Sequence, residues 1–372
     1  MNKCDVMIHV TTLGRGGTER YAKDLAIGLV RRKLRPCIVY DHPPEDLKPD
    51  FEVAGIPTFC INHTLNGDMT VYASRLADLL DELKPSIFHA TIWDNINIVS
   101  KVLRLSNIPM VITRHGPDRV PRLQDYLGIN RVPFYFYKER AAMRRSGGLI
   151  CGYEEGCNLT RLRFGRDTPV RLVYTGVPLS KEIAAVAEPR EDLQIVWVGE
   201  MCDRKRPLLA LRAFQRAQRS FPKIRLLMLG DGEYMGMVRN AVDEMKLDNV
   251  QTPGYIRNPM PFFLRSHLLL QTACAEGLAY VVKEALSVGL PVVATDAGGT
   301  REAVIHENTG LLAHVDDEDG LTNNLVRMLN DNSLRTSYGK AGLALCRAQF
   351  SLDEMVLRTL ATYKDFCGVT YE

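Results

Sequence analysis

Short apolar runs alternate with longer helical patterns along the whole chain. Several runs carry Val, Ile or Leu at consecutive positions, which is typical of strands buried on both faces of a parallel sheet. In the first half the predicted strands are 6–11, 36–41, 87–90, 110–113, 148–152 and 171–174. In the second half they are 194–199, 225–229, 249–254, 268–272, 291–295 and 310–313. This alternation predicts an α/β protein whose helices cover parallel sheets.

Two domains are expected, because the chain has 372 residues and single hydrophobic cores stop growing at roughly 250–300 residues. Segment 176–192 contains Pro178, Pro189 and many small or charged residues, and is interpreted as a linker. We therefore predict doubly wound domains over 1–178 and 190–350. Such sheets bind ligands beyond the carboxyl ends of their strands, so the predicted site is a cleft between the domains.

Composition excludes several classes of protein. The net charge of +3 is too small to indicate nucleic-acid binding. The nine cysteines are scattered without a CxxC pair, which indicates reduced cytosolic thiols. No secretory signal or membrane-spanning run is visible, so we expect a cytoplasmic protein. The acidic run 316–319 is interpreted as the first turn of a helix rather than a divalent-cation site, and no metal or cofactor is expected.

Two glutamates lie eight positions apart around a predicted helix start. Glu276 falls in a glycine-containing turn, and Glu284 falls about two turns inside the helix. Eight residues rotate about 80° around a helix, so both carboxylates can face one cleft. Backbone N–H groups at a helix N-terminus suit a diphosphate, and carboxylates accept hydrogen bonds from sugar hydroxyls. The pattern therefore predicts a site for ribose, phosphate and sugar.

A glycine-rich loop follows the first predicted strand. Gly14, Gly16 and Gly17 allow the backbone to approach a ligand closely, and a helix begins after them. A dinucleotide fingerprint would need glycine where Glu19 stands. The alternative to a phosphate-facing loop is a tight turn with Thr18 as the N-cap.

Cations and a histidine follow two other strands. Arg204, Lys205 and Arg206 come after strand 194–199, where they can neutralise a leaving diphosphate as a metal ion would. A surface charge run is the alternative. His115 follows strand 110–113, and this position favours function although a lone histidine is usually structural.

Basic residues are concentrated in the first half. Residues 101–150 hold ten lysines and arginines against three acidic residues, and segment 131–145 mixes aromatic rings with arginines. A solvated basic face, with a helix that buries its aromatic side, is the favoured interpretation. The alternative is contact with an anionic membrane surface or with a phosphate-bearing acceptor.

Together these segments resemble glycosyltransferase family 4, whose members are retaining enzymes of the GT-B fold. In that fold two Rossmann-like doubly wound domains face each other across a cleft. Residues 276–286 are similar to the family's E-x7-E motif, usually written EGFGLVLLEA, and 289–299 and 309–312 continue the similarity. Residues 229–232 resemble its GDG turn and 16–19 its N-terminal GG-x-E loop. The resemblance covers nearly the whole chain.

The resemblance implies roles for individual residues. Glu276, His115 and Lys205 would be catalytic, with Glu276 at the hydroxyls of the transferred sugar, His115 beside that sugar and Lys205 on the diphosphate. Glu284 would bind the ribose, and the backbone after Gly254 would meet the base. The donor-binding residues would be Gly16, Gly17, Gly199, Arg204, Lys205, Gly254, Tyr255, Glu276, Gly277, Leu278, Ala279 and Glu284.

The chain departs from the family pattern at two places. Glu200 stands where many members have an arginine, so Arg204 or Arg206 is expected to supply the missing cation. Leu278 and Ala279 replace the usual Phe-Gly, which predicts a narrower sugar pocket. A C-terminal helix at about 352–372 would pack back onto the N-terminal, acceptor-binding domain.

The resemblance thus implies a metal-independent retaining glycosyltransferase of bacterial cell-surface glycan biosynthesis. It would move a hexosyl or N-acetylhexosaminyl group from a nucleotide-diphosphate sugar, in the first place a UDP-sugar, to a glycan or lipid-linked glycan. It would be cytoplasmic, with 131–145 as a contact to the inner face of the plasma membrane. Two alternatives stay open: a nucleotide-sugar epimerase of the same fold, and a non-catalytic nucleotide-sugar-binding module.

Overall fold

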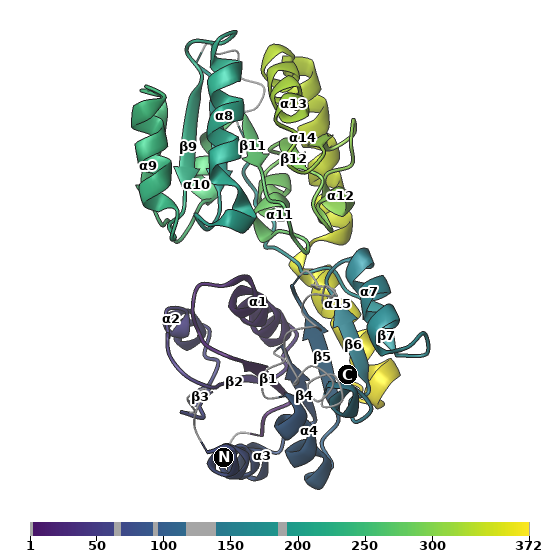
Figure 1. Ribbon diagram of the computed structural model, residues 1–372. Coiled ribbons are helices and arrows are strands. Elements are labelled where there is room, and N and C mark those ends of the chain that lie inside the picture. Colours follow the sequence, from purple (N-terminus) through teal and green to yellow (C-terminus); the bar gives the residue numbers. More distant parts are fainter. Residues whose placement is uncertain (1–2, 63–67, 92–95, 117–138, 185–191, 372) are drawn as a thin grey trace. The chain divides into compact units, whose positions relative to one another are not determined.

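The structure, a computed structural model, describes residues 3–62, 68–91, 96–116, 139–184 and 192–371. The chain forms two compact units (Figure 1). Unit 1 comprises Met1–Gly176 and Leu352–Glu372, and unit 2 comprises Val177–Ser351. Residues 131–138 of the basic aromatic segment lie outside the described residues.

Unit 1 contains a parallel sheet of seven strands in the order β3-β2-β1-β4-β5-β6-β7. The strands are β1 Val6–Val10, β2 Pro36–Tyr40, β3 Thr58–Cys60, β4 Ile87–Ala90, β5 Met110–Arg114, β6 Gly148–Cys151 and β7 Val170–Leu172. The described helices are α1 Gly17–Arg31, α2 Lys48–Val53, α3 Met69–Leu83, α4 Ile96–Leu105, α7 Glu154–Phe164 and α15 Leu352–Cys367. The strand order reverses at β1 and β4, which is the switch point beside which such sheets bind ligands.

Unit 2 contains a parallel sheet of six strands in the order β10-β9-β8-β11-β12-β13. The strands are β8 Gln194–Val198, β9 Arg225–Leu229, β10 Val250–Gly254, β11 Leu268–Gln271, β12 Val292–Thr295 and β13 Gly310–Ala313. The helices are η1 Asp203–Lys205, α8 Pro207–Gln218, α9 Met235–Glu244, α10 Met260–Arg265, α11 Tyr280–Ser287, α12 Thr300–Ala303, α13 Glu318–Asn330 and α14 Asn332–Gln349. All six strands predicted for this half are present.

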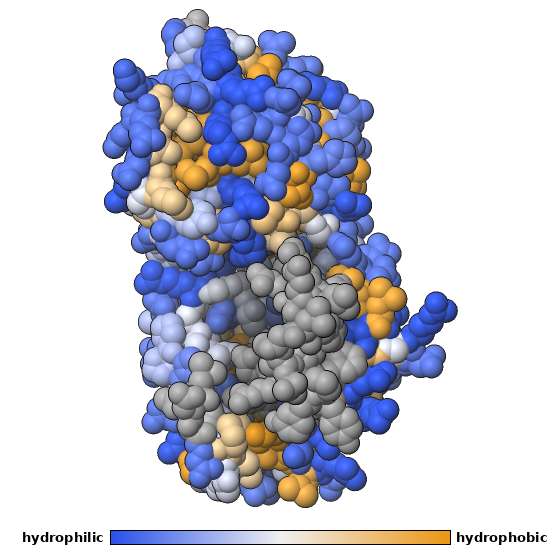
Figure 2. Space-filling model, viewed as in Figure 1, coloured by the Kyte–Doolittle hydropathy of each residue, from blue (hydrophilic) through white to orange (hydrophobic). Residues whose placement is uncertain are grey.

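Each sheet is buried by apolar helix faces. In unit 2, buried side chains of β8, β9 and β11 pack with α8, α9 and α13; Trp197 and Met228 are among them. In unit 1 β1, β2, β4 and β5 pack with α3 and α4 on one face. The visible surface of unit 2 is mostly hydrophilic, interrupted by hydrophobic side chains around α8 and α9 (Figure 2). The alternation of apolar and polar residues therefore directs each helix to its sheet.

The acidic run at residues 316–319 opens α13, as the sequence indicated. The side chain of Asp317 is the N-cap and accepts a hydrogen bond of 2.9 Å from the amide of Gly320. Glu318 and Asp319 occupy the first turn, where they complement the helix dipole. In the described parts of the chain, no group of three or more His, Cys, Asp or Glu side chains is arranged to hold a metal ion.

Helix α15 belongs to unit 1 although it follows unit 2 in the sequence. It packs against α1 and β5 (Figure 1). A Cβ atom on Gly28 of α1 would lie 2.4 Å from Val356, so this glycine allows the close approach of the two helices. Among the described residues, no helix combines the length and apolar character needed to span a bilayer.

Candidate functional site

The loops after β8, β9 and β10 pack directly on one another, and glycine makes this packing possible. Gly230 has a φ of +146°, and a Cβ atom there would lie 1.7 Å from the carbonyl oxygen of Gly199. The amide of Gly199 donates to Leu229 (3.0 Å), and that of Gly230 donates to Gly254 (2.9 Å). Glycine at these positions therefore allows the loops to pack closely. The loop after β8 continues into the cationic turn, residues 204–206.

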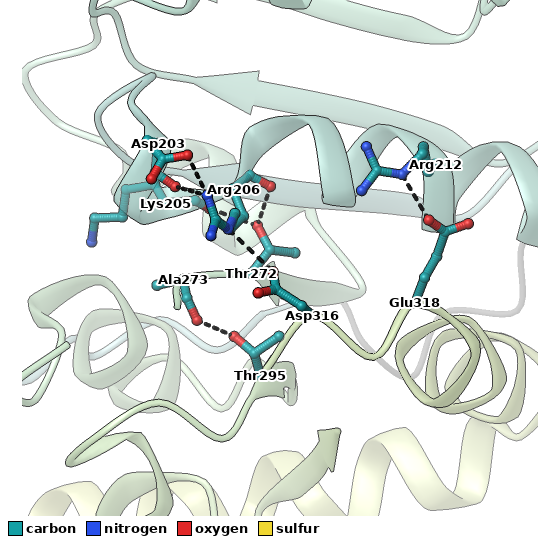
Figure 3. Close-up of polar contacts among 9 residues, drawn as sticks. All are labelled: Asp203, Lys205, Arg206, Arg212, Thr272, Ala273, Thr295, Asp316 and Glu318. Atoms are coloured by element: carbon teal, nitrogen blue, oxygen red, sulfur yellow. Dashed lines mark hydrogen bonds and ion pairs between the residues drawn. The ribbon is translucent and has the colours of Figure 1, made fainter. Parts of the chain in front are cut away.

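The cationic turn is tied to the end of β11. The hydroxyl of Thr272 lies 2.8 Å from the carbonyl oxygen of Lys205 and 3.0 Å from that of Arg206 (Figure 3). The amide of Cys274 donates to the carbonyl of Arg204 (2.9 Å). Because three consecutive carbonyls are held, the directions of the three cationic side chains are set by the backbone.

Arg206 turns away from the other two cations. Its guanidinium contacts the Asp203 carboxylate and lies 3.1 Å from Asp316 (Figure 3). Figure 3 also shows Lys205 extending away from this pair of acids. Arg206 is therefore neutralised by its own partners, and it anchors the turn instead of facing Glu276.

Glu276 contacts the other two cations, Arg204 and Lys205. Its Oε1 atom accepts a hydrogen bond from Arg204 Nη1 at 2.8 Å and also contacts Lys205 Nζ. The side chains of Glu276, Lys205 and Arg204 are 9%, 14% and 40% exposed. Arg204 Nη2 also lies 4.0 Å from Glu200 at the surface. The structure thus brings together three of the predicted site residues, and Arg204 rather than Arg206 is the second cation at Glu276.

The segment between the two glutamates is not helical throughout. Ala279 has φ −57° and ψ 130° and is the N-cap of α11, so Glu284 lies about one turn inside the helix, not two. The 80° rotation predicted from an unbroken helix therefore does not relate the two carboxylates. Glu284 is buried, as are Gly277, Leu278 and Ala279. No side chain caps the start of α11, which leaves this N-terminus without an anionic residue of its own.

The glycine loop of unit 1 does not start α1 as the tight-turn alternative expected. Gly16 is the N-cap, Gly17 is the first helical residue, and Thr18 is therefore not the cap. A Cβ atom on Gly16 would lie 2.3 Å from Glu19 Oε2, whereas one on Gly17 would meet nothing within 4 Å. Glu19 also accepts a hydrogen bond from Thr12 (3.0 Å). The Glu19 carboxylate thus folds back over the helix start.

His115 comes directly after β5 and packs on α1. Its ring centroid lies 4.3 Å from that of Tyr21, with the ring planes tilted by 58°. In unit 2, Gly254 has a φ of +92° and Tyr255 is 42% exposed beside it.

Three residues that contact the candidate site were not predicted from the sequence. Thr272, which holds the cationic turn, is an ordinary strand-end threonine, and Tyr21 is one apolar position of an amphipathic helix. Gly298 has a φ of +53°, and a Cβ atom there would lie 1.9 Å from the carbonyl oxygen of Glu276. Its signal was the glycine pair after β12, whose contact with the Glu276 loop only the fold reveals.

Comparison with known proteins places the chain among glycosyltransferases of the GT-B fold. Residues 15–181 match the family described as Glycosyltransferase Family 4, and residues 180–344 match the one described as Glycosyl transferases group 1. The chain belongs to the family 4 glycosyltransferases with the GT-B fold.

Relatives of known name include glycosyltransferases of bacterial surface glycans. The UDP-Gal:alpha-D-GlcNAc-diphosphoundecaprenol alpha-1,3-galactosyltransferase of Escherichia coli is 26% identical over 75% of each chain. The lipopolysaccharide core biosynthesis glycosyltransferase LpsE of Rhizobium meliloti is 25% identical over 90% of this chain and 92% of its own. An uncharacterised glycosyltransferase of Methanocaldococcus jannaschii is 30% identical, but the match spans only 32% of its length and 35% of this chain.

Solved structures show the same fold at low identity. The HepE protein of Anabaena, crystallised with UDP, superposes with a TM-score of 0.81 at 15% identity, over 97% of this chain and 100% of its own. Sucrose-phosphate synthase from Thermosynechococcus elongatus gives 0.78 at 17% identity, over 98% of this chain and 100% of its own.

Proposed function

We propose that the protein is a retaining glycosyltransferase that moves a sugar from a UDP-sugar to a hydroxyl group of a surface glycan or lipid-linked glycan. The observation that carries the proposal is the contact of Glu276 with Arg204 and Lys205 beside the uncapped start of α11. The UDP complex of HepE supports the choice of nucleotide. The lipid-linked acceptor named for the Escherichia coli relative supports the choice of acceptor.

The charges of the cluster suggest how donor binding prepares the reaction. Lys205 and Arg204 now share the carboxylate of Glu276. A donor diphosphate gives both cations a stronger, multiply charged partner and releases Glu276 to accept hydrogen bonds from the sugar hydroxyls. Amide groups at the start of α11 add a second source of positive potential. One set of residues thereby binds both the leaving group and the transferred sugar.

The transfer itself then needs no protein nucleophile. The bond between the sugar C1 and the diphosphate breaks, and a bond to the acceptor oxygen forms on the same face of the sugar. The acceptor proton passes to the departing diphosphate oxygen. Lys205 and Arg204 stabilise the negative charge that develops there, which is usually the largest contribution to catalysis.

The chain's own cations occupy the place of a divalent ion, so we propose metal-independent transfer. Full activity in the presence of a chelator such as EDTA is the expected result, and loss of activity that Mg²⁺ or Mn²⁺ restores would contradict it. The transferred group is a hexosyl or N-acetylhexosaminyl group in this proposal. In this proposal Leu278 and Ala279, which replace the family's usual Phe-Gly, narrow the pocket for it.

The other site residues keep the roles implied by the resemblance. Glu284, in the first turns of α11, binds the ribose, and Gly254 with Tyr255 meets the base. In unit 1, Gly16 and Gly17 approach the diphosphate, and His115 lies beside the transferred sugar. These assignments are part of the proposal.

Segment 131–145 is proposed as the contact with the inner membrane face, where a lipid-linked acceptor is found. In its described part, Arg140 and Arg144 are exposed. Arg145 instead points to Asn97 and Ser100, at 3.4 and 3.3 Å from their side-chain oxygens. Exposed arginines attract anionic headgroups by about 1 kcal/mol each.

The experiment that tests the function follows release of UDP from UDP-glucose, UDP-galactose and their N-acetylamino forms. Thermal-shift measurements with UDP, GDP and ADP first identify the base, because a bound ligand stabilises the fold. Release by the wild type and its loss in Glu276→Gln, with Asp316→Asn unaffected as the control, is the expected result. UDP binding without release under any condition favours a binding module, and conversion of the sugar nucleotide without release favours an epimerase.

A further inference from the structure

The imidazole of His115 packs against the aromatic ring of Tyr21. The Tyr21 ring lies 4.3 Å from it, centroid to centroid, in a tilted packing. Tyr21 is completely buried in α1, so its ring cannot move without disturbing the core of unit 1. Aromatic pairs at this separation have preferred relative orientations. The orientation of His115 therefore depends on how firmly the Tyr21 ring is held.

The hydroxyl end of Tyr21 is part of a buried chain of polar groups. Tyr21 Oη lies 3.4 Å from Thr113 Oγ1, which lies 2.5 Å from His89 Nε2. His89 Nδ1 in turn lies 2.6 Å from the hydroxyl of Tyr363. None of these four residues is more than 1% exposed. This series of polar groups links α15, through β4 and β5, to the Tyr21 ring that packs against His115.

Burial fixes the protonation states of these polar groups. Burial lowers the pKa of His89 to about 3, and it raises the pKa of Tyr21 to about 12. Thr359 of α15 lies at the Tyr21 hydroxyl as well. A neutral imidazole offers one donor and one acceptor, so His89 donates to one of its two hydroxyl neighbours and accepts from the other. Such networks strengthen cooperatively, and removing one member leaves its neighbour buried and unsatisfied.

We propose that Tyr21 is a positioning residue for His115, and that α15 holds it in place through Tyr363 and His89. The proposal rests on the proposed function, because His115 is the residue expected beside the transferred sugar. Tyr21 does not touch the reacting atoms in this scheme. It acts by keeping the imidazole in one orientation, and small misplacements of such groups cost about 10²-fold in rate.

The test combines a spectroscopic readout with turnover on the full-length protein. The imidazole C–H resonances of His115 are assigned by their loss in His115→Gln. In Tyr21→Leu these resonances move, because the shielding from the Tyr21 ring is removed, and UDP release falls about 10²-fold in kcat with an unchanged KM for the donor. Tyr21→Phe keeps the ring but loses its link to Thr113, so it restores most of the lost kcat and leaves only a small residual shift of the resonances. Tyr363→Phe moves the same resonances by a smaller amount.

A second cavity in α1 distinguishes the loss of His115 positioning from a general loss of stability. Leu29 is completely buried two turns further along α1. The control variant Leu29→Ala should therefore be destabilised to a similar extent as Tyr21→Leu. Unmoved His115 resonances in Tyr21→Leu, or an equal kcat loss in Leu29→Ala, overturn the positioning role. Unmoved resonances in Tyr363→Phe overturn the part assigned to α15. Moved resonances with unchanged kcat overturn the catalytic importance of the orientation, and failure of the function itself shows separately as full activity in Glu276→Gln.

Discussion

Arg204 Nη1 lies 2.8 Å from Glu276 Oε1, and Lys205 contacts the same oxygen atom. The residue proposed for the sugar and the residues proposed for the diphosphate are therefore held together before any donor binds. This arrangement limits repulsion between the neighbouring cations. It also makes the cations available only to a ligand that competes with a carboxylate, which a diphosphate does.

Arg204 and Arg206 should differ sharply in their effect on turnover. We expect Arg204→Gln to lower kcat/KM for the donor by about 10²-fold, because a cation at the leaving group is lost. Arg206→Gln should change it less than about threefold, because Arg206 is paired with Asp203 and Asp316. Steady-state kinetics of UDP release compare the two. Equal losses in the two variants would contradict the assignment of the missing cation to Arg204.

Lys205→Ala should remove nearly all transfer while the protein stays folded. Lys205 is the less exposed of the two cations at Glu276, at 14% against 40% for Arg204. A loss of about 10²–10³-fold in kcat is expected, the magnitude typical for one preorganised donor at a developing charge. Circular dichroism checks the fold. Near wild-type turnover in this variant would refute the assignment of the diphosphate site.

The stability of the protein should fall in mild acid because of His89. Burial lowers its pKa in the folded state from 6.5 to about 3. Above pH 6.5 the imidazole is neutral whether the chain is folded or unfolded, so it adds no pH dependence. Below that value only the unfolded chain takes up the proton, and each pH unit down to about 3 costs about 1.4 kcal/mol of stability.

Urea unfolding of the wild type and His89→Gln measures this effect. Between pH 8 and pH 5 the wild type should lose about 2 kcal/mol more than the variant. The fixed cost of replacing the side chain cancels, because each protein is compared with itself. Parallel pH profiles would show that His89 is protonated in the folded state.

Two glycines of unit 2 should respond in opposite ways to alanine. Gly230→Ala places a Cβ atom 1.7 Å from the carbonyl of Gly199 at a φ of +146°, so we expect a loss of at least about 2 kcal/mol. Gly236 lies in α9 with nothing within 4 Å of a Cβ atom there. Gly236→Ala should be neutral, or stabilising by up to about 1 kcal/mol. Thermal unfolding of both variants checks the pair, and a stable Gly230→Ala would contradict the packing of the loops.

The membrane contact should depend on Arg144 and on ionic strength. Arg144→Glu, alone or with Arg140→Glu, should weaken flotation with liposomes containing phosphatidylglycerol. Arg239→Glu makes the same change of charge on an exposed face of unit 2 and should have no effect. Absence of wild-type binding to these liposomes, or equal behaviour of all variants, would remove the membrane part of the proposal.

Strands buried on both faces were predictable because short runs of consecutive Val, Ile and Leu residues alternate with longer helical patterns, which is typical of a parallel sheet. β3 was missed because Thr58–Cys60 is a three-residue edge strand without a recognisable pattern. The sequence did not decide whether Arg204 or Arg206 is the second cation at Glu276. The left-handed backbone of Arg206, φ +49°, directs the two side chains differently, and the sequence does not reveal this conformation. Likewise, nothing local relates His89 to Tyr363, which is 274 positions away.

The way α15 completes unit 1 bears on how the polypeptide is made. During translation, residues 177–351 leave the ribosome as one continuous segment and can close their core at once. Unit 1 emerges earlier but must wait for Tyr363, and until then His89 has no hydroxyl group beside its Nδ1 atom. The half of the protein that is synthesised first is therefore the half that matures last.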